Sequence, residues 1–331
     1  MVAAGLALVL GAGVAGAGWL ATDVLAARRH LLASAHLVTE LRDRLAAGDR
    51  VGAGDAVARL RAETAAARTR TTATPWRLGA DLPGMGRDLA VVATIARVLD
   101  DLSRRGLPEL ADVAATLDPA ALTPRHGRMD VGPLRRAEPA LRVADAAVRR
   151  ARDEIAAVPV TGLAGPVAAA VAELRAGLTR AAAMTTTGVR AARLLPGMLG
   201  ADGPRTYLVL FQNLAEARAT GGIPGAFAVI RADRGAVRLV RTGTAARDLR
   251  VFLPPVARLS ETARSLYTER PAIFPADVNV SPDFPTAARL IREMYRLRTG
   301  QTVDGVIATD PVALAYLLSA TGPLRVSGGR R

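Results

Sequence analysis

The sequence predicts an α+β protein in three parts: an N-terminal transmembrane helix, an elongated helical bundle, and a small mixed α/β unit. Three observations lead to this prediction. Residues 2–22 carry no charge, apolar residues recur at helical spacing through 24–198, and short apolar runs typical of strands begin after Leu199. We therefore expect an anchor over 1–23, the bundle over 24–198 and the α/β unit over 199–331.

The composition limits the chemistry that the chain can perform. Half of the 331 residues are hydrophobic and only 3% are aromatic; alanine supplies much of the apolar content and favours helices. The formal net charge is +14, and all 44 basic residues are arginine. Most arginines are expected on solvated faces, but the surplus also attracts anionic partners such as phospholipid headgroups, phosphate-bearing polymers or nucleic acid. The absence of cysteine excludes disulfides, thiolate nucleophiles and cysteine metal sites, and it suits an exported protein.

The N-terminal apolar run predicts one membrane-spanning helix. Val2 to Thr22 is uncharged, and about 20 apolar residues cross the hydrocarbon core of a bilayer. Trp19 lies near its end, where an interfacial anchor belongs. Residues 11–16 read G-x-G-x-x-G, the glycine pattern of dinucleotide-binding folds. That pattern also needs a second strand, whereas residues 24–45 have the spacing of an amphipathic helix, so we prefer the anchor.

The middle of the chain reads as helices separated by loops. A helical stretch is expected over 24–70 with a glycine-rich interruption at Gly48–Gly54, followed by a loop over Thr71–Gly86. A helix over 109–117 and a loop over Asp118–Pro139 come next. Three more apolar faces are spaced by three and four residues: Leu89, Val92, Ile95, Leu99 and Leu102; Leu141, Ala144, Val148, Ala151 and Ile155; and Leu163, Val167, Val171, Leu174 and Leu178. This spacing indicates a helical bundle that serves as a stalk or packing scaffold.

The C-terminal part has the pattern of a mixed sheet. Strands are expected near 206–212, 225–231, 236–241 and 303–309, because these runs are apolar or alternate and are bounded by turn residues. The apolar residues of 284–298 predict an amphipathic helix on one face of that sheet.

Capping residues mark where the C-terminal helices begin and end. Ser281 or Asp283 can cap the amphipathic helix, and Asp310 opens a last helix that ends at Gly322. The sequence ends at Arg331, where another strand would run. We therefore expect the α/β unit to be incomplete at this end.

The densest polar cluster follows the first predicted strand. Gln212, Asn213, Glu216 and Arg218 precede two glycines, and α/β sheets place ligands at strand ends followed by glycine-rich loops. In a functional interpretation, Arg218 and Arg205 converge on a phosphate or carboxylate, which the guanidinium fork suits. In a structural interpretation, Asn213 and Glu216 hydrogen-bond the turn and the glycines only permit it. Both interpretations stay open.

The candidate site also takes in two aspartates, and several kinds of active site are excluded. The full set of candidate ligand-binding residues is Arg205, Asn213, Glu216, Arg218, Asp248 and Asp283. We expect no metal site and no cofactor, and all three histidines of the chain are expected to be structural or surface residues. Residues 127–331 contain no histidine, which excludes a Ser-His-Asp site there. The chain lacks P-loop and H-E-x-x-H motifs and the aromatic platforms of nucleic-acid binders, so we expect no nucleic-acid partner.

Three stretches resemble a family of bacterial membrane proteins grouped as domain of unknown function 4012. They read GPRTYLVLFQNLAEARATGGIPGA at 203–226, DVNVSPDFPTAARLIREMYRLRTGQTVDGVIATDPVALAYLLSATGP at 277–323 and TPWRLGADLPGMG at 74–86. The resemblance covers roughly residues 70–326. It implies an envelope protein with an N-terminal membrane segment, in a family whose members continue well past this point. It brings no established activity.

A more remote resemblance concerns mechanism. The run TGQTVDGVIATDPVALAYLLSATGPLRV is similar to the closing strand-helix-strand of the LytR-CpsA-Psr family, which transfers glycopolymers from polyprenyl pyrophosphate to peptidoglycan. That family uses arginines, aspartates and a divalent cation. Where it has Arg-x-Asp, this chain has Arg205-Thr-Tyr207, and its Pro-Arg-Asp motif has no counterpart. Asp248 is the nearest candidate for the aspartate of the Pro-Arg-Asp motif.

Together these observations predict a membrane-anchored cell-envelope protein whose α/β unit binds an anionic envelope component. The alternative is a LytR-CpsA-Psr-like phosphotransferase, with a divalent cation as its only cofactor. The expected partners are the membrane and an anionic lipid-linked or cell-wall polymer. Arg28 and Arg29 follow the anchor and would place the bulk of the chain in the cytoplasm. The abrupt start of the sequence, the absence of cysteine and the resemblance outweigh them, so we expect a single-pass protein with its bulk outside the cytoplasm.

Overall fold

The computed structural model describes residues 22–117 except 35, 42, 45 and 46, then residue 124 and residues 127–322. Residues 2–21 of the expected anchor, and the G-x-G-x-x-G motif with them, lie outside the described residues. Within the described part of the chain, no helix is both long enough and apolar enough to cross a bilayer.

The chain divides into two compact units. The helical unit consists of Met1–Thr123 and Gly132–Leu195, and the α/β unit of Pro124–Val131 and Pro196–Arg331. The expected α+β class is therefore confirmed.

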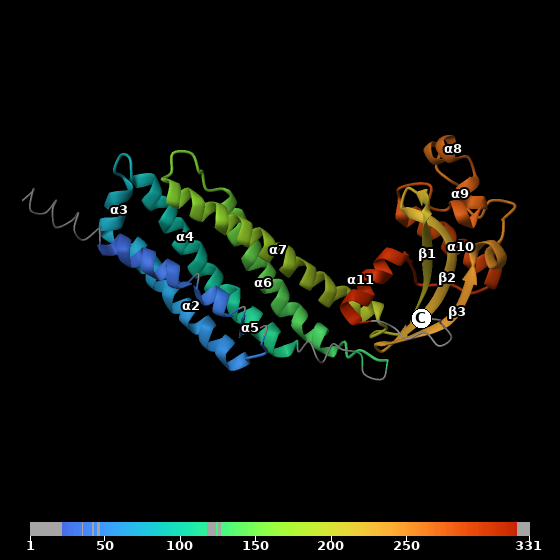
Figure 1. Cartoon of the computed structure of the whole chain (residues 1–331), viewed down its shortest axis with the longest axis horizontal. Helices are drawn as coiled ribbons and strands as arrows, with labels where there is room; N and C mark the ends of the chain where they lie inside the picture. The colour runs from blue at the N-terminus through green and yellow to red at the C-terminus, as the bar shows by residue number, and fades with distance from the viewer. Residues whose placement is uncertain are drawn as a thin grey trace, which may run out of the picture. The chain divides into compact units, whose positions relative to one another are not determined.

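Long helices form the helical unit (Figure 1). Residues 22–44 are helical wherever they are described. The helices that follow are α2 (Arg50–Thr71), α3 (Thr74–Ala80), α4 (Gly86–Arg105), α5 (Leu107–Thr116), α6 (Gly132–Ala156) and α7 (Gly165–Met198). Apolar residues of α4, α6 and α7, among them Ile95, Ile155 and Val171, share one buried core. The three predicted apolar faces thus do pack together.

Three loop boundaries of the prediction were wrong. The Asp49 side chain accepts a hydrogen bond from Gly52 N at 2.9 Å, so α2 starts at Arg50 and the interruption is shorter than expected. Helix α3 forms inside the expected loop, because Trp76 is buried there and donates to the Leu89 carbonyl at 3.0 Å. Helix α6 begins at Gly132 and tolerates Pro139 in its early turns.

A buried aspartate joins two helices of this unit. Asp100 of α4 is fully buried, and its carboxylate binds Arg68 Nη1 of α2 at 3.0 Å and Arg104 Nε at 2.9 Å. Beside it, the hydroxyls of Thr64 and Ser103 lie 2.8 Å apart. A buried carboxylate is tolerated only with such partners, so this polar layer fixes how α2 and α4 align.

We expect Asp100→Ala to destabilise the protein by about 1–3 kcal/mol, because it removes the buried acceptor of charge-assisted hydrogen bonds from Arg68 and Arg104. The matched control is Asp101→Ala, which changes the adjacent, partly exposed acid that also contacts Arg68 at 3.1 Å. It should cost less than about 1 kcal/mol. Chemical denaturation of both variants measures the difference, and equal losses would contradict the assigned role of Asp100.

The α/β unit contains a four-stranded sheet with strand order β3-β2-β1-β4. Figure 1 shows β1, β2 and β3 of this sheet side by side. Its strands are β1 (Arg205–Arg218), β2 (Gly221–Asp233), β3 (Ala236–Thr244) and β4 (Gly305–Thr309). The pairs β1–β2 and β2–β3 are antiparallel, and β4 runs parallel to β1. All four predicted strands are present, and β1 is longer than expected because its polar second half also pairs.

Helix α10 (Phe284–Thr299) covers one face of this sheet, as the sequence predicted. Phe227 of β2 meets Tyr295 edge to face, with ring centroids 6.0 Å apart. The segment between β3 and α10 contains short helical pieces: η1 (Ala245–Leu249), α8 (Glu261–Tyr267), α9 (Arg270–Ile273) and η2 (Pro275–Asp277). Helix α11 (Pro311–Thr321) follows β4 and is capped by Asp310, whose carboxylate accepts from Ala313 N at 2.8 Å.

Candidate functional site

Arg205 and Arg218 do not converge. They are the first and last residues of β1, a strand of 14 residues. At about 3.3 Å per residue, its two ends lie up to roughly 40 Å apart. The expectation that both arginines hold one anion was therefore wrong, because the polar residues between them continue the strand instead of forming a loop.

Arg205 has a structural partner at its own end of the strand. Its Nη1 lies 3.0 Å from Asp304 Oδ1, and both side chains are partly exposed. The other oxygen of Asp304 accepts a hydrogen bond from Thr206 N at 2.8 Å. That backbone bond, and then Arg205, lower the pKa of Asp304 below its usual value. This ion pair ties the start of β4 to the start of β1.

Asn213 and Glu216 lie at an irregularity of β1. The register passes from Asn213 opposite Ile223 to Ala217 opposite Gly222, which leaves residues 214–216 outside the ladder. Asn213 Oδ1 accepts a hydrogen bond from Ala215 N at 3.1 Å, and Glu216 is exposed on this bulge. For Asn213 the geometry matches the structural interpretation.

The two candidate aspartates also have local roles. Asp248 accepts from Thr244 N at 2.7 Å and lies 3.3 Å from Arg241 Nη2; the backbone bond, followed by Arg241, lowers the pKa of Asp248. Asp283 caps α10 by accepting from Thr286 N at 3.2 Å. Each carboxylate is thus already engaged in holding a turn or a helix end.

Arg218 belongs to a polar cluster that the sequence only half revealed. Its Nη2 lies 3.4 Å from Asp277 Oδ1, and Asp277 Oδ2 lies 2.6 Å from Arg270 Nη2. Asp277 is 6% exposed, and the Arg270 guanidinium also lies over the Phe274 ring, 5.0 Å from its centroid. Asp277 thus bridges two arginines that come from separate segments.

The glycine turn between β1 and β2 brings further polar groups to the same place. Gly221 pairs with Arg218, and the Gln212 side chain lies against it, since a Cβ on Gly221 would sit 2.3 Å from Gln212 Oε1. Asn279 Nδ2 donates to the Gly222 carbonyl at 2.9 Å. We call these residues the Arg218 cluster: Gln212, Arg218, Thr220, Arg270, Asp277 and Asn279.

The Arg218 cluster contains unsatisfied buried atoms. In the described part of the chain, four buried side-chain nitrogen or oxygen atoms lack a hydrogen-bond partner: Gln212 Nε2, Arg218 Nε, Thr220 Oγ1 and Asn279 Oδ1. Gln212 is 5% exposed and Asn279 1%. An unpaired buried polar atom costs about 1–3 kcal/mol, so four such atoms in one cluster point to a role beyond packing.

The candidate residues predicted from the sequence did not include Arg270, Asp277 or Asn279. The usable signal was that Asp277 and Asn279 alternate with Val278 and Val280, as in a segment with one buried polar side. The partner of Asp277 is Arg218, 59 residues away, and that of Asn279 is Gly222, 57 residues away. No local pattern indicates such pairs.

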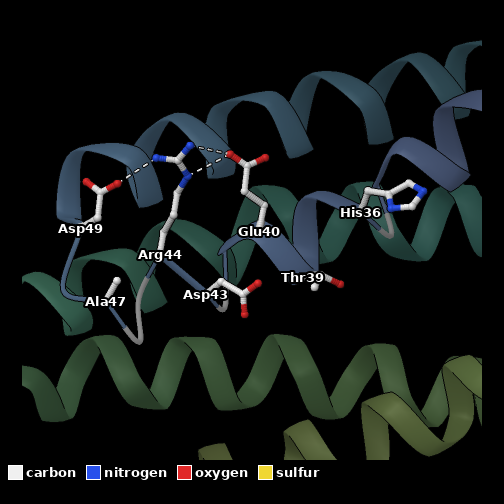
Figure 2. Close-up of a pocket in the computed structure, with 7 residues that line it drawn as sticks. All are labelled: His36, Thr39, Glu40, Asp43, Arg44, Ala47 and Asp49. Carbon is white, nitrogen blue, oxygen red and sulfur yellow. Dashed lines mark hydrogen bonds and ion pairs between the residues drawn. The ribbon is translucent and has the colours of Figure 1, made fainter.

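A second polar hollow lies in the helical unit. Figure 2 shows Arg44 reaching from Glu40 to Asp49, with hydrogen bonds of 2.9 and 2.8 Å. Arg59 binds the same Glu40 oxygen at 2.6 Å, and Arg59 followed by Arg44 lowers the pKa of Glu40. His36, Thr39, Asp43 and Ala47 complete the wall. These charges satisfy one another, and among the described residues no group of three acids or histidines is placed to hold a metal ion.

The comparison with known families concerns the C-terminal part of the chain. Residues 202–331 match the family model described as Protein of unknown function (DUF4012). The chain is similar to that family over these residues. The predicted resemblance is thereby confirmed over residues 202–331, which we call the DUF4012 region. This region contains the whole sheet and the Arg218 cluster. The similar stretch at 74–86 lies outside the match. No curated protein and no solved structure is significantly similar to the chain, and the LytR-CpsA-Psr similarity stays a prediction.

We expect Gly222→Ala to disrupt the hairpin end, because its Cβ would lie 2.0 Å from the carbonyl oxygen of Asn213. Backbone atoms cannot move aside cheaply, so a loss of several kcal/mol is expected. Gly225→Ala is the matched control in the same strand, since nothing lies within 4 Å of its added Cβ. Thermal unfolding should separate the two variants, and a near-neutral Gly222→Ala would refute the proposed close approach.

Proposed function

We propose that the chain is a membrane-anchored cell-envelope protein whose DUF4012 region binds an anionic envelope component at the Arg218 cluster. The bulk of the chain lies outside the cytoplasm in this proposal. Candidate ligands are lipid-linked or cell-wall polymers that carry phosphate or carboxylate groups. The uncharged run 2–22, the absence of cysteine and the family resemblance support the placement, and the net charge of +14 suits an anionic partner.

The observation that carries the ligand proposal is the set of unsatisfied atoms in the cluster. Arg218 Nε, Gln212 Nε2 and the Thr220 hydroxyl are hydrogen-bond donors without an acceptor. Two arginines and one aspartate leave a net charge of +1. Unfilled donors with a positive charge favour an oxyanion, and guanidinium groups bind phosphate and carboxylate with particular strength.

Access to the cluster comes from its arginines. The Arg270 side chain is 62% exposed and that of Arg218 24%, whereas Asp277 lies beneath them. An anion can therefore contact the guanidinium groups from solvent, and a rearrangement of these side chains on binding would expose the deeper donors to it. No separate observation favours the phosphotransferase alternative.

Titration calorimetry with inorganic pyrophosphate tests the site. Arg218→Gln should weaken binding about ten- to hundredfold, because it removes a charge-assisted hydrogen bond. Arg205→Gln is the matched control: it removes the arginine at the other end of β1, which also pairs with an aspartate, and it should leave affinity unchanged. Equal affinities of wild type and Arg218→Gln, with a lowered melting temperature, would assign Arg218 a purely structural role.

The placement in the envelope is tested with one introduced cysteine, because the chain has none of its own. Ala257 is exposed in a loop of the DUF4012 region. We expect Ala257→Cys to react with a membrane-impermeant maleimide in intact cells that lack an outer membrane. Labelling that occurs only after lysis would place this region in the cytoplasm and remove the envelope proposal.

A further inference from the structure

Strand β3 presents an exposed surface that, unlike the Arg218 cluster, combines arginines with large apolar side chains. It is the edge strand of the sheet (Figure 1), and residues 237–242 are exposed without interruption. We use the name β3 surface for the exposed arginines and apolar residues of this strand together with Arg231, which lies opposite on β2. Its members are Arg231, Val237, Arg238, Leu239, Val240 and Arg241. Strand β3 pairs with residues 226–233 of β2. Arg231 is ten residues along β2 from Gly221, so this surface lies roughly 30 Å from the Arg218 cluster.

The β3 surface and the loop after it are strongly basic. Residues 231–258 contain seven arginines and two aspartates, a balance of +5. Both aspartates are already paired, Asp233 with Arg234 and Asp248 with Arg241, each at 3.3 Å. No acid of this stretch is left to balance the remaining arginines.

Two of those arginines face each other. Arg231 and Arg238 are directly opposite in the β2–β3 register, and both are exposed. Neither has an ion-pair partner among the described residues. Like charges directly opposite on neighbouring strands are destabilising. An anion that binds both guanidinium groups would relieve this repulsion.

The same strand exposes large apolar side chains. Leu239 is 64% exposed, Val240 58% and Val237 45%. A register irregularity passes over Val240, which has no partner on β2. Arginines and a bulge are common means of keeping an edge strand from pairing with another chain. That function accounts for the charges and the bulge, but not for three exposed apolar side chains.

We propose that the β3 surface rests on an anionic phospholipid membrane. Leu239 and Arg238 point to opposite faces of the sheet, so the strand meets the bilayer with its free edge. Leu239 and Val240 then enter the interfacial region, while Arg231 and Arg238 bind lipid phosphates at the level of the headgroups. Interfacial binding elements combine apolar side chains with basic ones in this way, and an anionic leaflet attracts each nearby arginine. A soluble polyanion would not bury the side chains of Leu239, Val240 and Val237 on binding, whereas a lipid surface would. The lipid surface is therefore the favoured partner.

The absence of cysteine allows a site-specific test in the full chain. Leu239→Cys, labelled with an environment-sensitive nitrobenzoxadiazole probe, is mixed with phosphatidylcholine vesicles with or without phosphatidylglycerol. We expect a blue-shifted, brighter signal only with phosphatidylglycerol. Leu266→Cys is the matched control: it lies on α8 of the same unit with 67% exposure, so its probe should stay in water even when the N-terminal segment inserts.

The charge contribution is tested in the labelled protein by Arg231→Gln with Arg238→Gln. Each lost arginine should weaken the phosphatidylglycerol response roughly fivefold. An equal response of both probes, or one that does not depend on phosphatidylglycerol or on the two arginines, would overturn the proposal. A response to soluble polyglutamate but not to vesicles would also overturn it, in favour of an acidic protein partner.

Discussion

The close approach of Gly222 to the carbonyl of Asn213 is the constraint on which the C-terminal region depends. Because no side chain fits there, β1 and β2 can pair on both sides of the bulge at 214–216 and turn within two residues. The hairpin then directs Arg218 toward the loop that carries Asp277 and places the Gly222 carbonyl next to Asn279. One steric requirement thus aligns a long strand pair and assembles the Arg218 cluster.

The fold could be predicted to the extent that it follows from local periodicity. The four strands and α10 were found because apolar residues recur with the period of the element, and Asp283 and Asp310 were recognised as caps because capping chemistry is local. Element boundaries failed where a contact distant in sequence decided them. Trp76 makes α3 a helix by reaching α4, and the polar half of β1 is a strand only because β2 pairs with it.

The candidate site was predicted less well for the same reason. Arg218 was found from its polar surroundings, but its partners come from a loop 59 residues further along the chain. Arg205 was grouped with Arg218 because a cluster followed by glycines was read as a loop. In fact Arg205 is held by Asp304, 99 residues away. Spacing in sequence says nothing about such pairs until the strand order is known.

Arginine, the only basic residue type of the chain apart from its three histidines, serves in three different environments. Arg68 and Arg104 compensate the buried charge of Asp100, so their role is structural. Arg218 and Arg270 share Asp277 but leave buried donors unfilled beside them. Arg231 and Arg238 share no acid and face each other in solvent.

Salt should act differently on the last two environments. Exposed charges are screened within about 8 Å at physiological ionic strength, whereas buried pairs are screened much less. Attraction of anions by Arg231 and Arg238 therefore weakens strongly as ionic strength rises. The Arg218 cluster is built on an aspartate that is 6% exposed and on donors that solvent does not reach. In the proposed function, selectivity at the Arg218 cluster therefore depends on hydrogen-bond geometry more than on charge, whereas the proposed binding at Arg231 and Arg238 depends mainly on charge.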